Sequence, residues 1–132
     1  MIALESRWQL LDGCPPELDE ALKAVAPTVM DAEPNTLVYS VHLEAKFPLN
    51  SDFKPADPPP PPIPLSSQKE VIFFEVYADA QAFADHINGP VFTKFRTENI
   101  QYFQEDPNSP GWPVTKNTFF ERESAFFRPE AN

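Results

Sequence analysis

The segment from residue 71 to residue 92 constrains the fold of this chain more strongly than any other. Its first part, Val71–Tyr77, is apolar on both faces except for Glu75. A strand that faces solvent on one side alternates polar and apolar residues, whereas a strand covered on both sides reads as a continuous apolar run. The sequence therefore predicts a central, buried strand that carries one carboxylate.

A helix is predicted directly after this strand, over residues 80–88. Asp79 is a favourable N-cap, and Gly89 followed by Pro90 is a common helix stop. The predicted helix carries Phe83 and His86 one turn apart, so both side chains can face one cavity.

Apolar periodicity predicts the other elements. Leu18, Leu22, Val25 and Val29 form the stripe of an amphipathic helix. Pro27 lies inside this pattern and removes a backbone donor, so the last turn is expected to kink or to form a separate short turn. The final predicted strand has Phe120 and Phe126 on one face and Phe119 and Phe127 on the other, so both faces are expected to be buried. The expected strands cover residues 3–11, 37–45 and 117–127, and the expected helices cover residues 17–30 and 91–104.

The element order is strand, helix, strand, strand, broken helix and strand, which is the order of a ferredoxin-like, split βαβ domain of the α+β class. Such a sheet has helices on one face only. Strands that are apolar on both faces therefore predict that a second copy covers the open face, and a twofold homodimer is the commonest solution. We expect one domain over residues 1–132.

A proline-rich insertion interrupts this domain at residues 47–67. It holds eight of the 17 prolines, including the unbroken run Pro58–Pro62, which favours a stiff, extended backbone. Three arrangements are open for it and for its proline-rich part, residues 55–64: a solvated hairpin, an arm that lies across the domain, or an arm that reaches a partner.

Charge and cysteine content exclude several classes of function. The net charge of −10 repels phosphate backbones and anionic lipid headgroups, so neither nucleic acid nor a membrane surface is an expected partner. No apolar run approaches the ~20 residues that span a bilayer. Cys14 is the single cysteine, so no intrachain disulfide or cysteine metal cluster can form, and a reducing, cytoplasmic setting is expected.

Two motifs resemble those of the antibiotic biosynthesis monooxygenase family of dimeric α/β barrels. Glu33-Pro34-Asn35, followed by Tyr39, is similar to that family's corner between a helix and a strand. Glu75-Val76-Tyr77 is similar to its second signature, which continues in this chain with Ala82, Phe83, His86, Pro90 and Phe92. The similarity spans residues 17–103 without the insertion.

The resemblance implies a monooxygenase that needs no cofactor and acts with dioxygen on a small hydroxyaromatic or quinol. It implies a base or hydrogen-bond partner in an aromatic pocket, and His86 and Glu75 are the candidates for catalysis. Each of the two also has a structural alternative. His86 could be a helix histidine that only packs, and Glu75 could be a buried hydrogen-bond anchor. The candidates for binding the substrate are Tyr39, Tyr77, Trp8, Phe83, Phe92 and Phe95.

Departures from the haem-degrading relatives argue against haem chemistry. Those relatives carry a tryptophan where this chain has Tyr77 and a histidine near the position of Arg96, and their first-strand asparagine has no counterpart here. No spacing of His, Asp or Glu resembles a metal site. The alternatives to a monooxygenase are a dimeric module of the same fold that binds a small ligand or acts in a stress response, and a small isomerase or decarboxylase with His86 as base.

Overall fold

A computed structural model describes residues 1–129 of the chain, and its elements follow the predicted order. In sequence they are β1 (Ile2–Gln9), α1 (Leu18–Ala32), β2 (Thr36–His42), β3 (Glu70–Tyr77), α2 (Ala80–Ile87), α3 (Pro90–Asn99) and β4 (Thr115–Phe120), with short 3₁₀ turns at Leu65–Ser67 and Ile100–Tyr102.

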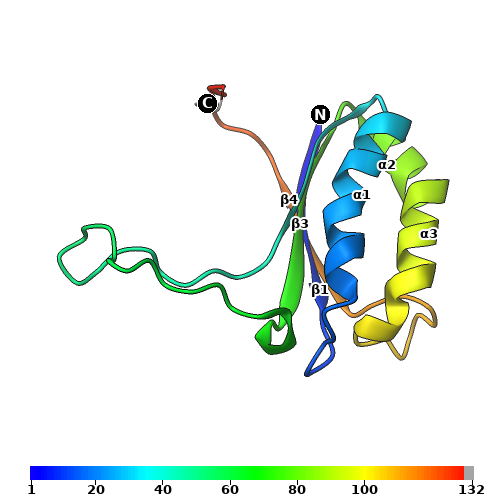
Figure 1. Ribbon diagram of the computed structural model, residues 1–132. Coiled ribbons are helices and arrows are strands. Elements are labelled where there is room, and N and C mark those ends of the chain that lie inside the picture. The colour runs from blue at the N-terminus through cyan, green and yellow to red at the C-terminus, as the bar shows by residue number, and fades with distance from the viewer. Residues whose placement is uncertain (130–132) are drawn as a thin grey trace.

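The four strands form one antiparallel sheet in the order β2-β3-β1-β4, and all three helices cover the same face of it (Figure 1). β3 lies in the middle, as its two-sided apolar pattern predicts. The domain has the ferredoxin-like α+β fold that the element order indicates. The opposite face carries no helix, and we call it the open face.

Aromatic rings fill the space between the sheet and the helices. Trp8 is their centre: its ring centroid lies 5.0 Å from that of Phe73, 5.2 Å from Phe103, 5.8 Å from Phe95 and 5.9 Å from Phe92. Tilted and edge-on pairs at such distances are the favourable arrangements of aromatic side chains. Helix α1 closes this core with its predicted stripe of buried residues, Leu18, Leu22, Val25 and Val29.

The start and the end of α2 have the predicted local causes. The Asp79 carboxylate accepts a hydrogen bond from the backbone N–H of Ala82 at 2.8 Å and caps the helix. At Gly89 the chain passes so close to α2 that a Cβ atom would lie 2.5 Å from the carbonyl oxygen of Asp85. The glycine is therefore required by close backbone approach, and Pro90 begins α3.

Helix α1 does not break at Pro27, which corrects the expectation of a kink or a separate turn. It runs without interruption to Ala32. The hydroxyl of the next residue, Thr28, donates to the carbonyl of Ala24 at 2.8 Å. The buried stripe on both sides of the proline holds the last turn on the sheet, and this packing offsets the lost backbone bond.

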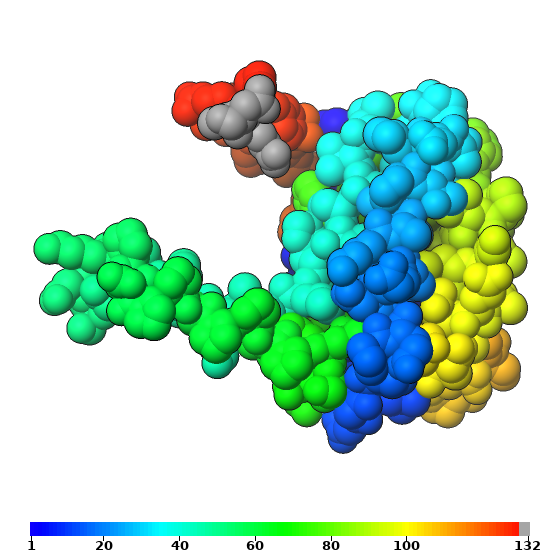
Figure 2. All heavy atoms as spheres, viewed as in Figure 1, coloured from blue at the N-terminus to red at the C-terminus, as the bar shows by residue number. Residues whose placement is uncertain are grey.

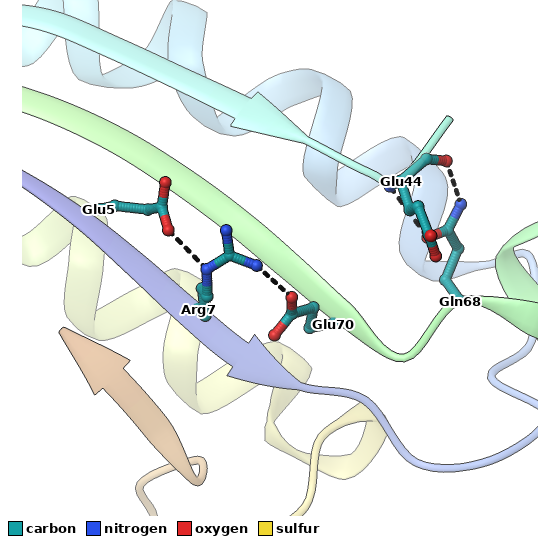
Figure 3. A network of polar contacts seen from close by, with 5 residues as sticks. All are labelled: Glu5, Arg7, Glu44, Gln68 and Glu70. Atoms are coloured by element: carbon teal, nitrogen blue, oxygen red, sulfur yellow. Dashed lines mark hydrogen bonds and ion pairs between the residues drawn. The ribbon is translucent and has the colours of Figure 1, made fainter. Parts of the chain in front are cut away.

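Strand β2 is shorter than predicted, ending at His42 where residue 45 was expected. Beyond it the buried side chain of Gln68 replaces a strand partner: its amide donates to the Glu44 carbonyl at 2.9 Å and accepts from the Glu44 N–H at 3.0 Å (Figure 3). The register of β2 also shifts between Thr36 and Val38, which leaves Leu37 56% exposed and takes it off the face of Tyr39.

Strand β4 also ends early, at Phe120, so the expected strand through residue 127 is wrong in its second half. The residues that follow Phe120 are the polar run Glu121–Ser124, which has neither the alternation nor the propensity of a strand. Phe126 and Phe127 consequently lie outside the sheet, 77% and 75% exposed, and each packs beside an arginine guanidinium.

The insertion stands away from the domain and does not lie across it. Residues 47–67, which we call the arm, project on the side of the open face, and the segment after β4 projects on the same side (Figure 1 and Figure 2). Among residues 1–129, no helix combines the length and the apolar character needed to cross a membrane.

Candidate active site

A cavity of about 240 Å³ lies between the helix-facing side of the sheet, helices α2 and α3, and the loop before β4. It is somewhat smaller than the ~300–1,000 Å³ of typical ligand pockets. β1, β3 and β4 contribute the floor, and the helices and the loop contribute the walls. Its lining consists of Leu4, Ser6, Trp8, Glu75, Phe83, Ile87, Phe92, Asp106, Ser109, Trp112, Pro113, Thr115 and Asn117.

Glu75 is the buried carboxylate of this cavity, with 5% of its surface exposed. Burial raises the pKa of Glu75 to about 7, the hydrogen bond from Tyr77 opposes that rise, and the negative charge of Glu33 adds to it. A carboxyl group with this pKa exchanges its proton near neutral pH, which is the property of an acid–base group.

Tyr77 and Tyr39 lie beside Glu75 on the helix-facing side of the sheet. The Tyr77 hydroxyl donates to Oε2 of Glu75 at 3.1 Å, and Tyr39 is the direct cross-strand neighbour of Glu75. Burial, reinforced by the Glu75 charge, raises the pKa of both tyrosines above the ordinary value. Both hydroxyls therefore stay protonated, and Tyr77 acts as a fixed donor to the carboxylate.

His86 lies behind this group and not in the lining of the cavity. It is 1% exposed and packed among the rings of Tyr39, Tyr77 and Phe92, with centroids at 5.4, 5.5 and 5.3 Å. Its Nδ1 lies 2.7 Å from Oε1 of Glu33. Nδ1 must carry a proton in this contact, because a carboxylate can only accept.

The remaining nitrogen of His86, Nε2, is buried and has no hydrogen-bond partner within residues 1–129. Burial lowers the pKa of the ring, although the Glu33 charge and its hydrogen bond act in the opposite direction. The imidazole is therefore neutral at pH 7, with its basic lone pair on Nε2 and its orientation fixed by Glu33.

The loop before β4 is held over the cavity by Arg96 of α3. Nη1 of Arg96 donates to the Gly111 carbonyl at 2.7 Å, and the guanidinium carbon lies 4.1 Å from the ring centroid of Trp112. Trp112 in turn packs 5.6 Å from Phe92. The cation–π contact and the hydrogen bond together fix this wall of the cavity.

The structure places four of the eight predicted site residues on the cavity: Glu75, Trp8, Phe83 and Phe92. His86, Tyr39 and Tyr77 form a cluster directly behind Glu75. Phe95 lies apart in the core, between Trp8 and Phe73. Except for Phe95, the predicted set is therefore brought together around Glu75, and half of the set faces the cavity.

The sequence reasoning missed Glu33 and the polar lining of the cavity. Ser6 could have been found, because it alternates with the apolar residues Leu4 and Trp8 on one strand and must therefore face the same side of the sheet. Asn117 has the same parity as Phe119 and pairs with Ser6 across β1 and β4. The loop residues Asp106, Ser109 and Trp112 gave no such signal, since loops have no period.

No group of three or more His, Cys, Asp or Glu side chains is arranged to hold a metal ion within the part of the chain that is described, residues 1–129. The arrangement offers instead one carboxyl group of nearly neutral pKa, a fixed phenol donor and an aromatic cavity. These parts suit the binding of a planar ligand and the removal of a proton from it.

Comparison with known proteins identifies the family of the chain. The sequence model of the antibiotic biosynthesis monooxygenases matches residues 1–98, which include both motifs and all three helices except the last residue of α3. The chain belongs to this family. No curated protein matches the chain.

Solved structures agree with the family in fold. A Deinococcus radiodurans protein provisionally assigned to the same family superposes with a TM-score of 0.60 at 15% identity, over 98% of this chain and 100% of that one. A variant of SnoaB, a cofactor-independent oxygenase from Streptomyces nogalater, gives a TM-score of 0.55 at 12% identity, over 94% of each chain. PA3566 from Pseudomonas aeruginosa gives 0.59 at 18% identity, over 93% of this chain and 94% of that one.

Proposed function

We propose that this protein is a cofactor-independent monooxygenase that oxidises a small hydroxyaromatic or quinol in the cavity around Glu75. One observation carries the proposal: a carboxyl group with a pKa near 7 lies on the floor of an aromatic cavity in a member of this family. A group with that pKa can accept a ring hydroxyl proton at neutral pH and return it later.

The proposed reaction begins when Glu75 removes the hydroxyl proton of the bound substrate. The resulting anion is electron-rich and can pass one electron to dioxygen, after which the radical pair joins to form a carbon–oxygen bond. The peroxide takes a proton back from Glu75 and loses water. One oxygen atom stays on the substrate, the other leaves as water with two substrate hydrogens, and the substrate supplies all the electrons.

The other predicted residues have supporting roles in this proposal. Trp8, Phe83 and Phe92 contact the flat faces of the substrate. Tyr77 holds the Glu75 carboxylate in one orientation through its hydroxyl. His86, fixed by Glu33, and Tyr39 pack behind that pair, so we treat His86 as a positioning residue, and Phe95 supports Trp8 from the core.

The lining of the cavity favours a neutral substrate. Two carboxyl side chains, Glu75 and Asp106, face the same small volume and repel an anionic ligand. Ser6, Ser109 and Asn117 offer hydrogen bonds to ring hydroxyl groups. A compact phenol or quinol that has no carboxylate is the class that these contacts fit.

We include a twofold homodimer and a cytoplasmic setting in the proposal. The dimer is supported by exposed apolar surface on the open face. A row of apolar residues crosses all four strands there, namely Val38, Val76, Ala3 and Phe120. Its end residue Phe120 is 45% exposed, and Phe74 beside the row is 38% exposed. The cytoplasmic setting is supported by Cys14, a free thiol that is only 1% exposed.

Oxygen uptake with a panel of reduced quinones and polyphenols tests the activity. We expect uptake with at least one compound, and Glu75→Gln should lower kcat at least 100-fold, since it cannot accept the proton. The matched control is Glu98→Gln, which changes an exposed carboxylate on α3 and should leave the rate unchanged. Turnover of a substrate in the absence of oxygen would instead indicate an isomerase or decarboxylase.

The second candidate is a non-catalytic module that binds a small aromatic ligand. It is favoured by the position of His86, which does not reach the cavity. The two tryptophans of the chain, Trp8 and Trp112, both line the cavity, so ligand binding should change intrinsic fluorescence. Saturable fluorescence changes without oxygen uptake across the panel, unaffected by Glu75→Gln, would favour this module over the monooxygenase.

A further inference from the structure

The arm, residues 47–67, has a defined shape although it projects from the domain, and Leu65 near its base packs against the core. At its base, Gln68 is 2% exposed and its amide makes three hydrogen bonds, to the N–H and carbonyl of Glu44 and to the carbonyl of Ile63. Figure 3 shows the two bonds to Glu44. The arm therefore leaves the sheet in a fixed direction.

The tip of the arm is also ordered by its own hydrogen bonds. The side chain of Asn50 accepts from the N–H groups of Asp52 and Lys54 at 2.9 and 3.2 Å. The backbone closes the same turn between Asn50 and Lys54 and between Pro48 and Ala56. These bonds form a compact turn, whereas a solvated linker needs none of them.

This ordered turn presents aromatic surface to solvent. Phe53 is 77% exposed and Phe47 is 66% exposed, although large aromatic side chains strongly favour burial. The arm buries neither of them within its own subunit. Two exposed phenylalanines on a preformed projection are the features of an anchor for a partner surface.

The open face shows which partner fits. The arm and the segment after β4 both project on that side and leave a hollow between them (Figure 2). The charged residues of the face balance, since Glu5 and Glu70 are matched by Arg7 and Lys116, and Arg7 is paired with both glutamates (Figure 3). A second copy can therefore approach this face despite the net charge of −10.

We propose that the arm of each subunit grips a second copy of this chain, with Phe47 and Phe53 packed on the partner. The proposal rests on the homodimer of the proposed function, and it adds a contact that the sheet faces do not provide. Twofold symmetry makes the grip reciprocal, so two arms act in one dimer. An arm fixed at its base loses little conformational freedom when it binds, which favours the contact.

Sedimentation equilibrium of the full chain tests the proposal through the dimer dissociation constant. Phe47→Asp with Phe53→Asp should weaken dimerisation at least tenfold, because each side chain is an anchor that aspartate cannot replace. Phe53 has φ of 58°, a conformation that aspartate tolerates, so the variant should fold. Met30→Asp is the control, since Met30 is 73% exposed on α1, away from the arm, and should leave the constant unchanged.

Photo-crosslinking gives a second readout that does not depend on affinity. Phe53→Cys, labelled with a maleimide benzophenone in a Cys14→Ser background, is mixed with isotope-labelled protein and irradiated. We expect crosslinked peptides that join a light chain to a heavy chain. Crosslinks confined to one chain, together with an unchanged dissociation constant for the arm variant, would overturn the grip while leaving the dimer and the oxygenase proposal intact. A chain that is monomeric at all concentrations would overturn both the arm contact and the dimer. The oxygenase activity would still be tested independently by oxygen uptake.

Discussion

The Glu75 side chain is an ionisable carboxyl group that is almost completely buried. Its ordinary pKa is 4.5, and burial raises it to about 7 in the folded protein. Between these values the folded state holds a proton that the unfolded state has released. The stability contributed by this group is therefore fully present below pH 4.5 and is lost as the pH rises to about 7.

Glu75→Gln should remove this pH dependence. The rise of the pKa from 4.5 to about 7 corresponds to roughly 3 kcal/mol of unfolding free energy. Relative to the wild type, the variant should therefore gain up to that amount of stability between pH 4.5 and pH 8. Urea unfolding at several pH values measures the difference between the two proteins. A difference that does not change with pH would show that Glu75 ionises normally in the folded state.

The Arg96 side chain acts on a whole element, the loop before β4. Its hydrogen bond to Gly111 and its position over Trp112 connect this loop to α3. Within the loop the hydrogen bonds are local: the Asp106 N–H donates to the Trp112 carbonyl at 2.8 Å, and the Gly111 N–H donates to Oε1 of Glu105 at 3.3 Å. Arg96 is therefore a main tie between this loop and α3, together with the packing of Trp112 on Phe92.

Arg96→Leu should loosen the loop without unfolding the domain. We expect amide hydrogen exchange over residues 105–113 to accelerate by about tenfold, equivalent to ~1.4 kcal/mol, while exchange in β1 and β3 stays slow. Lys94→Leu, an exposed change on the same helix, should have no such effect. Equal exchange rates in the two variants would mean that the loop is held by other contacts.

Gly89 sets the angle between α2 and α3 through a close backbone contact. Gly89→Ala would place a methyl group 2.5 Å from the Asp85 carbonyl oxygen, so the two helices must separate. We expect a loss of about 1–3 kcal/mol of folding stability, measured by chemical denaturation. Thr93→Ala, an exposed change in the same helix, is the control, and similar losses in both variants would refute the close-contact explanation.

At the scale of the molecule, one face of the sheet carries the helices and the other carries an apolar row beside balanced charges. Phe74 lies on the open face next to this row and is 38% exposed. Phe74→Arg should convert the proposed dimer to a monomer, because a buried unpaired charge is costly. Analytical ultracentrifugation at micromolar concentration checks this, and a wild type that is already monomeric would contradict the dimer.

Local patterns predicted the element order well and the element ends less well. The Asp79 cap and the Gly89-Pro90 stop act on backbone groups within a few residues, so the sequence reveals them directly. The ends of β2 and β4 depend on whether a neighbouring strand continues. Gln68, which replaces that neighbour beside β2, is 24 residues from Glu44 and could not be recognised by periodicity.

The candidate site divides in the same way. The continuous apolar run around Glu75 indicated correctly that this carboxylate lies in a buried strand, because the pattern is local to the strand. It could not indicate that His86 turns away from the cavity toward Glu33, 53 residues earlier in the chain. That contact depends on how the end of α1 packs on α2.

The α+β element order, the apolar central strand and the family of the chain could all be inferred from the amino-acid sequence, because each follows from local patterns of polarity or from short motifs. The contacts between side chains became visible only in the folded chain. Glu75 lies on the floor of a cavity with His86 behind it, Arg96 and Trp112 close the wall, and the arm projects beside the open face. These contacts join segments that are distant along the chain, and only the packing of whole elements fixes them.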